Sequence, residues 1–219
     1  MSSPTPDPKD PKSPATEFDL EAFWIQYRSK FLLGMCAIIV VLLSYAAYEW
    51  NRSKTLNGAE ERLATAKTEE EFQKVVADYP KTNAAGCAML LLAEQQRKSG
   101  KLEESTKSIR SFMDGYPEHP LFSGGLTSLA TNLEAQGKSS EALAEYDKVS
   151  TSYGKTFSTP VALMASARLL RLGGSKEQKE KATQIYEKVI AEYPDNLASQ
   201  QAAQEMKQLK KLRVPLVAF

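Results

Sequence analysis

Few residues of this chain could carry out chemistry, and their spacing does not support a reaction. The 219 residues include one histidine, His119, and two cysteines, Cys36 and Cys87, which lie far apart in the sequence. A zinc site needs several His, Cys or acidic ligands, and a hydrolytic triad needs a nucleophile beside a base. His119 stands between Glu118 and Pro120, where we expect a turn. We therefore expect no metal, no cofactor, no disulfide framework and no enzyme activity.

Two short motifs resemble binding sites but have the wrong surroundings. Residues 153–156 read Tyr-Gly-Lys-Thr and contain the end of a phosphate-binding loop, yet Val149 stands where that loop needs a further glycine. The three glutamates at 69–71 point around a helix rather than at one site. Near a helix start they stabilise the helix dipole. We interpret this run as a helix cap and predict no small-molecule substrate.

The overall charge excludes one further class of partner. There are 28 Lys and Arg residues against 27 Asp and Glu residues, which gives a formal net charge of +1. Binding of nucleic acid usually needs a broad positive field, so we expect no nucleic-acid partner. The length allows one modest domain with appendages.

The N-terminal quarter of the chain has the pattern of a membrane anchor. Residues 31–48 contain no charged side chain, and a helix of that length spans roughly 27 Å. Amphipathic aromatic residues and basic residues stand on both sides of it: Trp24, Tyr27, Arg28 and Lys30 before it, and Tyr45, Tyr48, Trp50, Arg52 and Lys54 at or after its end. We predict a disordered Pro-rich arm at 1–17, an amphipathic juxtamembrane segment at 18–30 and a transmembrane helix at 31–50.

The sequence leaves two properties of this helix undecided: its direction across the membrane and whether a partner helix packs on it. The basic residues on its two sides balance, so the positive-inside rule favours neither direction. Gly34, Ala37 and Ser44 lie along one face, together with Val41 and Tyr48. A seam of small residues allows a partner helix to approach, although such residues are also common in membrane helices generally.

The chain beyond residue 50 repeats with a period of about 37 residues. One marker is a tyrosine that precedes proline or glycine, at steps of 37, 37 and 40 residues: Tyr79, Tyr116, Tyr153 and Tyr193. A second marker is a glycine at steps of 37: Gly100, Gly137 and Gly174. Two markers with one period predict stacked units, each of which buries its apolar face on its neighbours.

Each unit contains two apolar helical patterns, with the spacing of a tetratricopeptide repeat. We expect glycine to end the first helix with a left-handed cap and proline to stop the second. Three extra residues around 175–179 should lengthen a turn or a helix start. The residues predicted to pack the repeats or end their helices are Leu92, Ala93, Gly100, Ile109, Pro117, Ala130, Gly137, Ala142, Tyr146, Ala167, Gly174, Ala182, Tyr186 and Pro194.

The repeat domain is predicted at 51–212, with about three full repeats plus capping helices, followed by an apolar tail at 213–219. A short polar helix at 59–66 and a second one with Phe72 and Val75 form an incomplete first repeat. The fold class is therefore all-α, a single N-terminal transmembrane helix followed by a tetratricopeptide-like α-solenoid. First helices should line a concave partner groove, with these residues facing it: Glu94, Arg97, Thr131, Glu134, Arg168 and Arg171.

The layout over 18–212 resembles the YfgM-type ancillary subunits of the bacterial SecYEG translocon. The resemblance is carried by the amphipathic start, by the membrane helix with Gly34, Tyr45 and Trp50, and by an array that begins near 84–86. It implies a bacterial inner-membrane protein with a cytoplasmic N-terminus and a periplasmic repeat domain. The implied partners are SecYEG and periplasmic chaperones or their clients.

Two classes of function follow from these patterns. The first is a membrane-tethered interaction scaffold or chaperone adaptor in protein export or envelope protein assembly. The second is a structural accessory subunit of another membrane complex, held mainly through the small-residue seam. Both need the lipid bilayer and protein partners, and neither needs catalysis.

Overall fold

The structure, a computed structural model, describes residues 20–213, which divide into two compact units at Ser53 and Lys54. The described residues are helical apart from their turns and loops, which confirms the all-α prediction. The predicted arm at 1–17 and positions 214–219 of the predicted tail lie outside the described residues.

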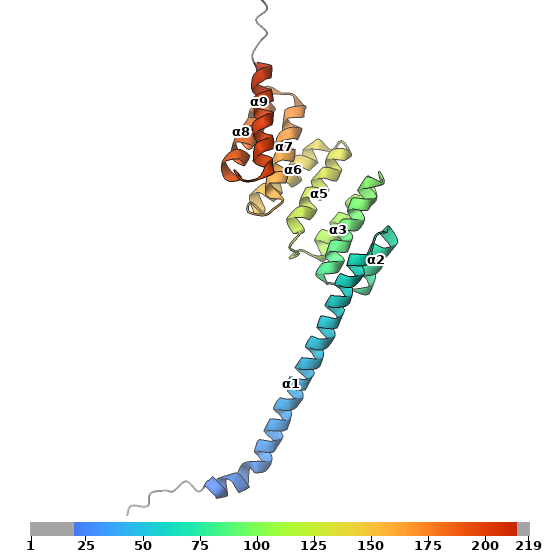
Figure 1. Cartoon of the computed structure of the whole chain (residues 1–219), viewed down its shortest axis with the longest axis vertical. Coiled ribbons are helices and arrows are strands. Elements are labelled where there is room, and N and C mark those ends of the chain that lie inside the picture. The colour runs from blue at the N-terminus through green and yellow to red at the C-terminus, as the bar shows by residue number, and fades with distance from the viewer. Residues whose placement is uncertain (1–19, 214–219) are drawn as a thin grey trace, which may run out of the picture. The chain divides into compact units, whose positions relative to one another are not determined.

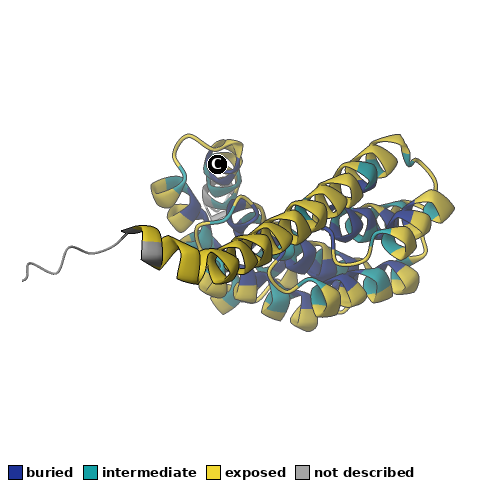
Figure 2. Cartoon of the chain, turned by 90° about the horizontal axis from the view of Figure 1, so that it is seen from below, coloured by how far each residue is buried: buried dark blue, intermediate teal, exposed yellow. Residues whose placement is uncertain are grey.

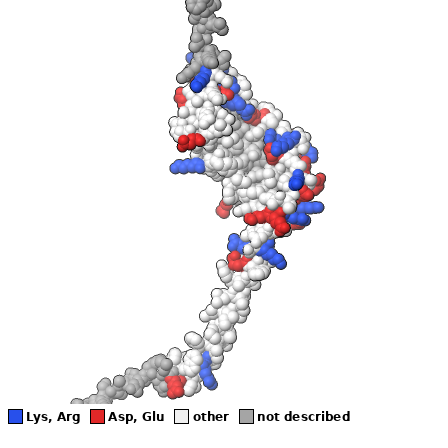
Figure 3. Space-filling view, viewed as in Figure 1, with Lys and Arg blue, Asp and Glu red and all other residues white. Residues whose placement is uncertain are grey.

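The first helix, α1 (Leu20–Thr65), is continuous over 46 residues. It runs through positions 30 and 50, because no proline interrupts it and glycine alone does not stop a helix. Its large apolar side chains are exposed over the first unit, with Leu33 74% and Val41 66% accessible (Figure 2). This stretch is long and apolar enough to cross a membrane. Figure 3 shows this stretch as the part of the helix without Lys, Arg, Asp or Glu side chains.

Within the described residues, the second unit contains the end of α1 and eight further helices that follow one another as a stack of antiparallel pairs (Figure 1). Each helix packs mainly on the one before and the one after it. The helices are α2 (Glu69–Asp78), α3 (Asn83–Lys98), α4 (Leu102–Gly115), α5 (Phe122–Ala135), α6 (Ser139–Ser152), α7 (Thr159–Gly173), α8 (Lys176–Glu192) and α9 (Leu197–Arg213). This arrangement is a tetratricopeptide-like solenoid.

The incomplete first repeat differs from the sequence prediction in one respect. The segment expected as a short separate helix at 59–66 is the C-terminal part of α1. Ala59 is fully buried there, and Leu63 packs against the cluster of Phe72 and Val75 on α2. No helix-breaking sequence separates this segment from the apolar stretch, so the helix continues.

Repeat boundaries are formed by the two marker residues. Gly100, Gly137 and Gly174 have φ of 78°, 78° and 86°, the left-handed conformation that glycine adopts without a steric penalty. Each recurring tyrosine is the residue at which a second helix ends. Pro117 and Pro194, named above among the packing residues, are exposed, so they act as helix stops and not as core.

The core lies between paired helices. Its alanines leave room for close approach: Ala93, Ala130, Ala142, Ala167 and Ala182 are all at most 2% exposed. Tyr146 and Tyr186 fill the spaces beside them and are 1% and 0% exposed. In the third repeat the three extra residues lengthen the start of α8, which has 17 residues against 14 in α6.

Candidate protein-binding groove

The first helices of the repeats, α3, α5, α7 and α9, form one side of the array. Helix α7 contacts the first helices α5 and α9 in addition to the helices before and after it in the chain. The six residues predicted for the groove are at least partly exposed. They occupy two equivalent positions: 94, 131 and 168 in one row, and 97, 134 and 171 in the other.

The structure brings three of the six predicted residues together between α5 and α7. One Arg168 amino group donates to both carboxylate oxygens of Glu134, at 2.9 and 3.0 Å. The buried Tyr146 of α6 reaches the same place, where its hydroxyl donates to Glu134 at 3.2 Å and lies 3.2 Å from the Thr131 hydroxyl. Burial raises the pKa of Tyr146, so it remains a neutral donor near neutral pH.

The other predicted residues form separate contacts. On α3, Arg97 donates twice to Glu94 of the same helix, at 2.8 and 2.7 Å, and its hydrogen bonds lower the pKa of that carboxyl. On α7, Arg171 approaches Glu205 of α9, with 3.6 Å between Nε and the carboxylate oxygen. The groove arginines are therefore paired with carboxylates, and none of these three projects as an unpaired cation.

Sequence reasoning missed two contributors to this surface. Glu205 lies on the terminal helix α9, to which no groove residue was assigned, and Tyr186 was expected only to pack. The signal for Glu205 was weak: across the insertion the repeat step is 40 residues, which places the equivalent of Arg168 at Gln208, one helical turn beyond Glu205. Tyr186 lies 40 residues after Tyr146, which is the period plus the insertion.

Apolar side chains flank the charged pairs. On α7, Val161 and Leu172 are 56% and 65% exposed, and on α9 Leu197 is 66% exposed. Between these helices lies a hollow of about 380 Å³, lined by Met164, Ala165, Arg168, Tyr186, Gln201, Gln204 and Glu205. Aromatic, Met and Arg side chains are enriched where proteins bind one another, so this surface suits a protein segment.

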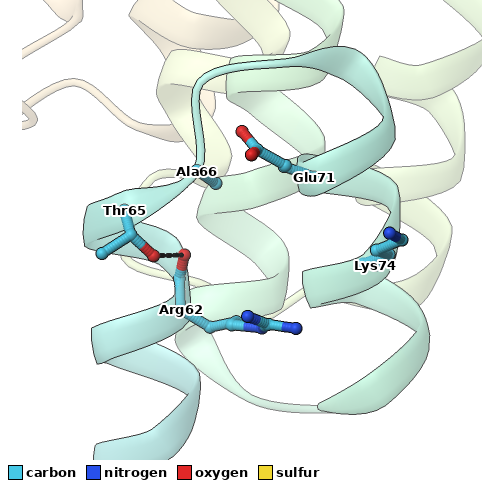
Figure 4. A pocket seen from close by; sticks show the side chains of 5 residues that line it. All are labelled: Arg62, Thr65, Ala66, Glu71 and Lys74. Carbon is cyan, nitrogen blue, oxygen red and sulfur yellow. Dashed lines mark hydrogen bonds between the residues drawn. The ribbon is translucent and has the colours of Figure 1, made fainter.

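A second hollow lies between the end of α1 and α2, and its polar groups have a structural role (Figure 4). It measures about 140 Å³ and is lined by Arg62, Thr65, Ala66, Glu71 and Lys74. The Glu71 carboxylate accepts hydrogen bonds from the Lys67 and Thr68 amides at 2.6 and 3.0 Å. These bonds complete a capping box at the start of α2, as the acidic run suggested.

The single histidine links two loops of the array. Its Nδ1 accepts from the Leu121 amide at 3.0 Å, and its Nε2 lies 3.1 Å from the Asn83 carbonyl, to which it donates as the neutral tautomer. Cys87 lies 3.9 Å from Nε2, and burial raises the pKa of its thiol, which disfavours a reactive thiolate. Within residues 20–213 no group of three or more His, Cys, Asp or Glu residues could hold a metal ion.

The predicted seam of α1 is exposed along its length. Gly34, Ala37 and Ser44 are all accessible, and the Ser44 hydroxyl donates to the Val40 carbonyl at 2.8 Å. A Cβ added at Gly34 would meet no described atom within 4 Å.

The comparison with known families agrees with this architecture. A family profile described as "Tetratricopeptide repeat-like domain" matches residues 21–162, which include both the apolar stretch of α1 and the first two complete repeats. The chain belongs to the tetratricopeptide repeat-like domain family. A further profile, "Tetratricopeptide repeat", matches residues 162–196. Such repeats are protein-interaction modules and are generally not catalytic.

Solved structures show the same fold. A tetratricopeptide repeat protein from Parabacteroides merdae is similar at a TM-score of 0.50 and 18% identity, over 69% of this chain and 57% of that one. The nearly identical TPR-like repeats of a Podosopora anserina kinesin light chain candidate are similar at a TM-score of 0.51 and 21% identity, over 77% and 87% of the two chains. This chain thus spans little more than half of the Parabacteroides protein. No curated protein matches the sequence.

Proposed function

We propose that this chain is a membrane-tethered interaction scaffold or chaperone adaptor that assists protein export or envelope protein assembly next to the Sec translocon. The observation that carries the proposal is the groove of α5, α7 and α9. It combines the Glu134–Arg168 pair with exposed apolar side chains and the hollow beside Tyr186. Such a surface can bind a protein segment and does not assemble a reaction centre.

Helix α1 supports the proposed tether. Exposed apolar residues over 31–48 would be costly in water, whereas in lipid they are favourable. A helix in lipid satisfies its backbone hydrogen bonds internally. For the direction of insertion, the resemblance noted above favours a cytoplasmic N-terminus and a periplasmic array in the bacterial inner membrane.

Recovery of partners in mild detergent tests the proposal. The full chain, purified from membranes, should retain translocon subunits or periplasmic chaperones in proportion to itself, as measured by quantitative mass spectrometry. Arg168→Gln removes the positive partner of Glu134 without placing two carboxylates side by side, and it should lower recovery. Lys148→Gln, at an exposed ion pair on α6, is the matched control. Equal recovery from all three proteins would contradict a role for the groove.

Labelling in intact cells tests the proposed location. A cysteine at exposed Lys138 should react with a membrane-impermeant reagent once the outer membrane is permeable. Reaction that appears only after the inner membrane is broken would reverse the orientation.

A structural accessory subunit of another membrane complex is the second candidate. The observation that favours it is the exposed small-residue face of α1 with Gly34, Ala37 and Ser44, which can seat a neighbouring helix. Gly34→Leu should then abolish co-purification while Arg168→Gln leaves it unchanged. The opposite pattern supports the scaffold.

A further inference from the structure

Two tyrosines occupy equivalent positions in consecutive repeats but differ in their hydroxyl partners. Tyr146 of α6 and Tyr186 of α8 are both essentially inaccessible, at 1% and 0% exposure. The Tyr146 hydroxyl donates to Glu134 and lies beside Thr131. Among the described residues, none meets full hydrogen-bond geometry with the Tyr186 hydroxyl. Burial raises the pKa of Tyr186, and Arg171 makes only a weak contact that lowers this pKa by a smaller amount. A buried polar group without a partner is costly, so it needs an explanation.

The position of Tyr186 offers one. This side chain lines the hollow between α7 and α9, together with Arg168, Gln201, Gln204 and Glu205. Two further buried polar atoms nearby, Arg171 Nε and Glu205 Oε2, also lack hydrogen-bond partners, and they lie 3.6 Å from each other. Polar groups whose mutual contacts are too long or too poorly aligned for full hydrogen bonds thus gather at one place in the groove.

The balance of charges selects the chemistry of the ligand. Arg168 is paired with Glu134 and Arg171 with Glu205, so the charges at the hollow cancel. An added carboxylate would meet Glu134 and Glu205, and an ammonium group would meet the two arginines. An apolar side chain would leave the hydroxyl unpaired. A neutral carboxamide can accept from Tyr186 or Arg171 and donate to Glu205 at the same time.

We propose that the hollow between α7 and α9 binds the side-chain carboxamide of an asparagine or glutamine in an extended segment of a partner protein. The inference rests on the proposed function, since it names the chemistry that the same groove recognises. The main chain of the segment would lie at the rim, where Val161, Leu172 and Leu197 contact its apolar side chains. The Arg171–Glu205 contact is longer than a hydrogen bond, and such partly exposed pairs are weak, so the two side chains can separate to admit the carboxamide.

The first test compares the two tyrosines without any ligand. Tyr146→Phe removes hydrogen bonds that exist, so it should lower the melting temperature of the full chain in detergent. Tyr186→Phe removes none, so it should leave the melting temperature unchanged or raise it. A decrease for Tyr186→Phe as large as that for Tyr146→Phe would overturn the inference, because the hydroxyl would then have a partner inside the fold.

The second test measures the ligand preference directly. Three capped pentapeptides, Ala-Leu-X-Leu-Ala with X as Gln, Glu or Met and with N-methylamide ends, are titrated into the full chain carrying ¹³C-methyl methionine. Met164 lines the hollow and reports binding by NMR. The Gln peptide should bind about fivefold more tightly than the other two, and Tyr186→Phe should remove that preference while Tyr146→Phe keeps it.

The outcomes separate this inference from the proposed function. Equal affinity for the three peptides, or no response of Met164 to any of them, would overturn the carboxamide site. The scaffold would still stand if Arg168→Gln lowered partner recovery in the membrane preparation. Loss of the Gln preference in Tyr186→Phe, with unchanged affinity for the other two peptides, would support the carboxamide site specifically.

Discussion

The apolar stretch of α1 and the core of the repeat array are built from the same kinds of side chain, but their exposure is opposite. Val41 is 66% exposed and Leu33 74%, whereas Val149 is 0% and Leu129 2% exposed. Residues of equal hydrophobicity can be buried either in protein or in lipid. The difference teaches that the repeats bury their own apolar surface, while the stretch of α1 leaves its apolar side chains exposed, as a helix in lipid would.

The largest expected effect comes from charges placed in the apolar stretch. Ile38→Lys combined with Val41→Lys should cost about 5–7 kcal/mol in a membrane-spanning helix, since one lysine at the helix centre costs about 2.5–3.5 kcal/mol. The protein should shift from the membrane to the soluble or degraded fraction, as measured by flotation on a density gradient. Asn57→Lys with Glu60→Lys, in the exposed continuation of the same helix, should remain membrane-bound. Flotation of the Ile38/Val41 variant at the wild-type level would contradict a lipid-embedded apolar stretch in α1.

The next effect probes the array core. Ala142 is fully buried between α6 and its neighbours, so Ala142→Leu should overpack the repeat and cost about 1–3 kcal/mol. Chemical denaturation followed by circular dichroism measures the loss. Ala144→Leu on the exposed side of the same helix is the control. If both variants unfold at the wild-type midpoint, Ala142 is not a close-approach position.

A smaller effect sharpens the account of how the array helices begin. The Ser175 hydroxyl accepts from the Gln178 amide at 3.1 Å, so Ser175→Ala should cost about 1 kcal/mol. At the start of α6 the N-cap residue is Lys138, and no side chain makes a cap bond there. Ser139→Ala therefore removes no cap and should cost less than Ser175→Ala. Thermal melts of the two variants give the order, and a reversed order would contradict the capping assignment.

The smallest effect is a dependence on pH. Hydrogen bonds from the Lys67 and Thr68 amides lower the pKa of Glu71 below its ordinary value of 4.5. The folded state therefore binds this proton less readily than the unfolded state. The stabilisation is fully present above pH 4.5 and is lost as the pH falls through the lower folded pKa. Melting temperatures between pH 7 and 3 should fall less steeply for Glu71→Gln than for the wild type, and parallel curves would show that the bonds contribute nothing.

Much of the fold could be predicted because it depends on local rules. The 37-residue steps of Gly100, Gly137 and Gly174 indicate helix ends in the left-handed backbone conformation, which glycine adopts most easily. The run of apolar residues over 31–48 predicts a helix long enough to cross a membrane, and the structure forms one continuous helix there. Periodicity also places Glu134 and Arg168 on the same side of neighbouring helices, because their spacing of 34 residues is one repeat less one turn.

The candidate site was harder to predict because it depends on contacts between distant residues. No pattern shows that Arg171 meets Glu205, since α9 is an atypical terminal helix and its partner choice depends on packing. Nor does the sequence distinguish Tyr146 from Tyr186, which have the same type and the same place in their repeats. Their different hydroxyl environments follow from which side chains approach across the groove: Thr131 and Glu134 for Tyr146, and the spaced Arg171 and Glu205 beside Tyr186.

Photo-crosslinking in living cells tests the central claim most directly, that a membrane-held array binds protein through its groove. A benzoylphenylalanine at Gln201 lines the hollow, and one at Glu187 lies exposed on α8, a second helix of its pair. The account predicts discrete cross-linked protein species from Gln201 in the membrane fraction, lost in the Arg168→Gln background, and little product from Glu187. Equal products from the two positions, or products from Glu187 alone, would contradict it.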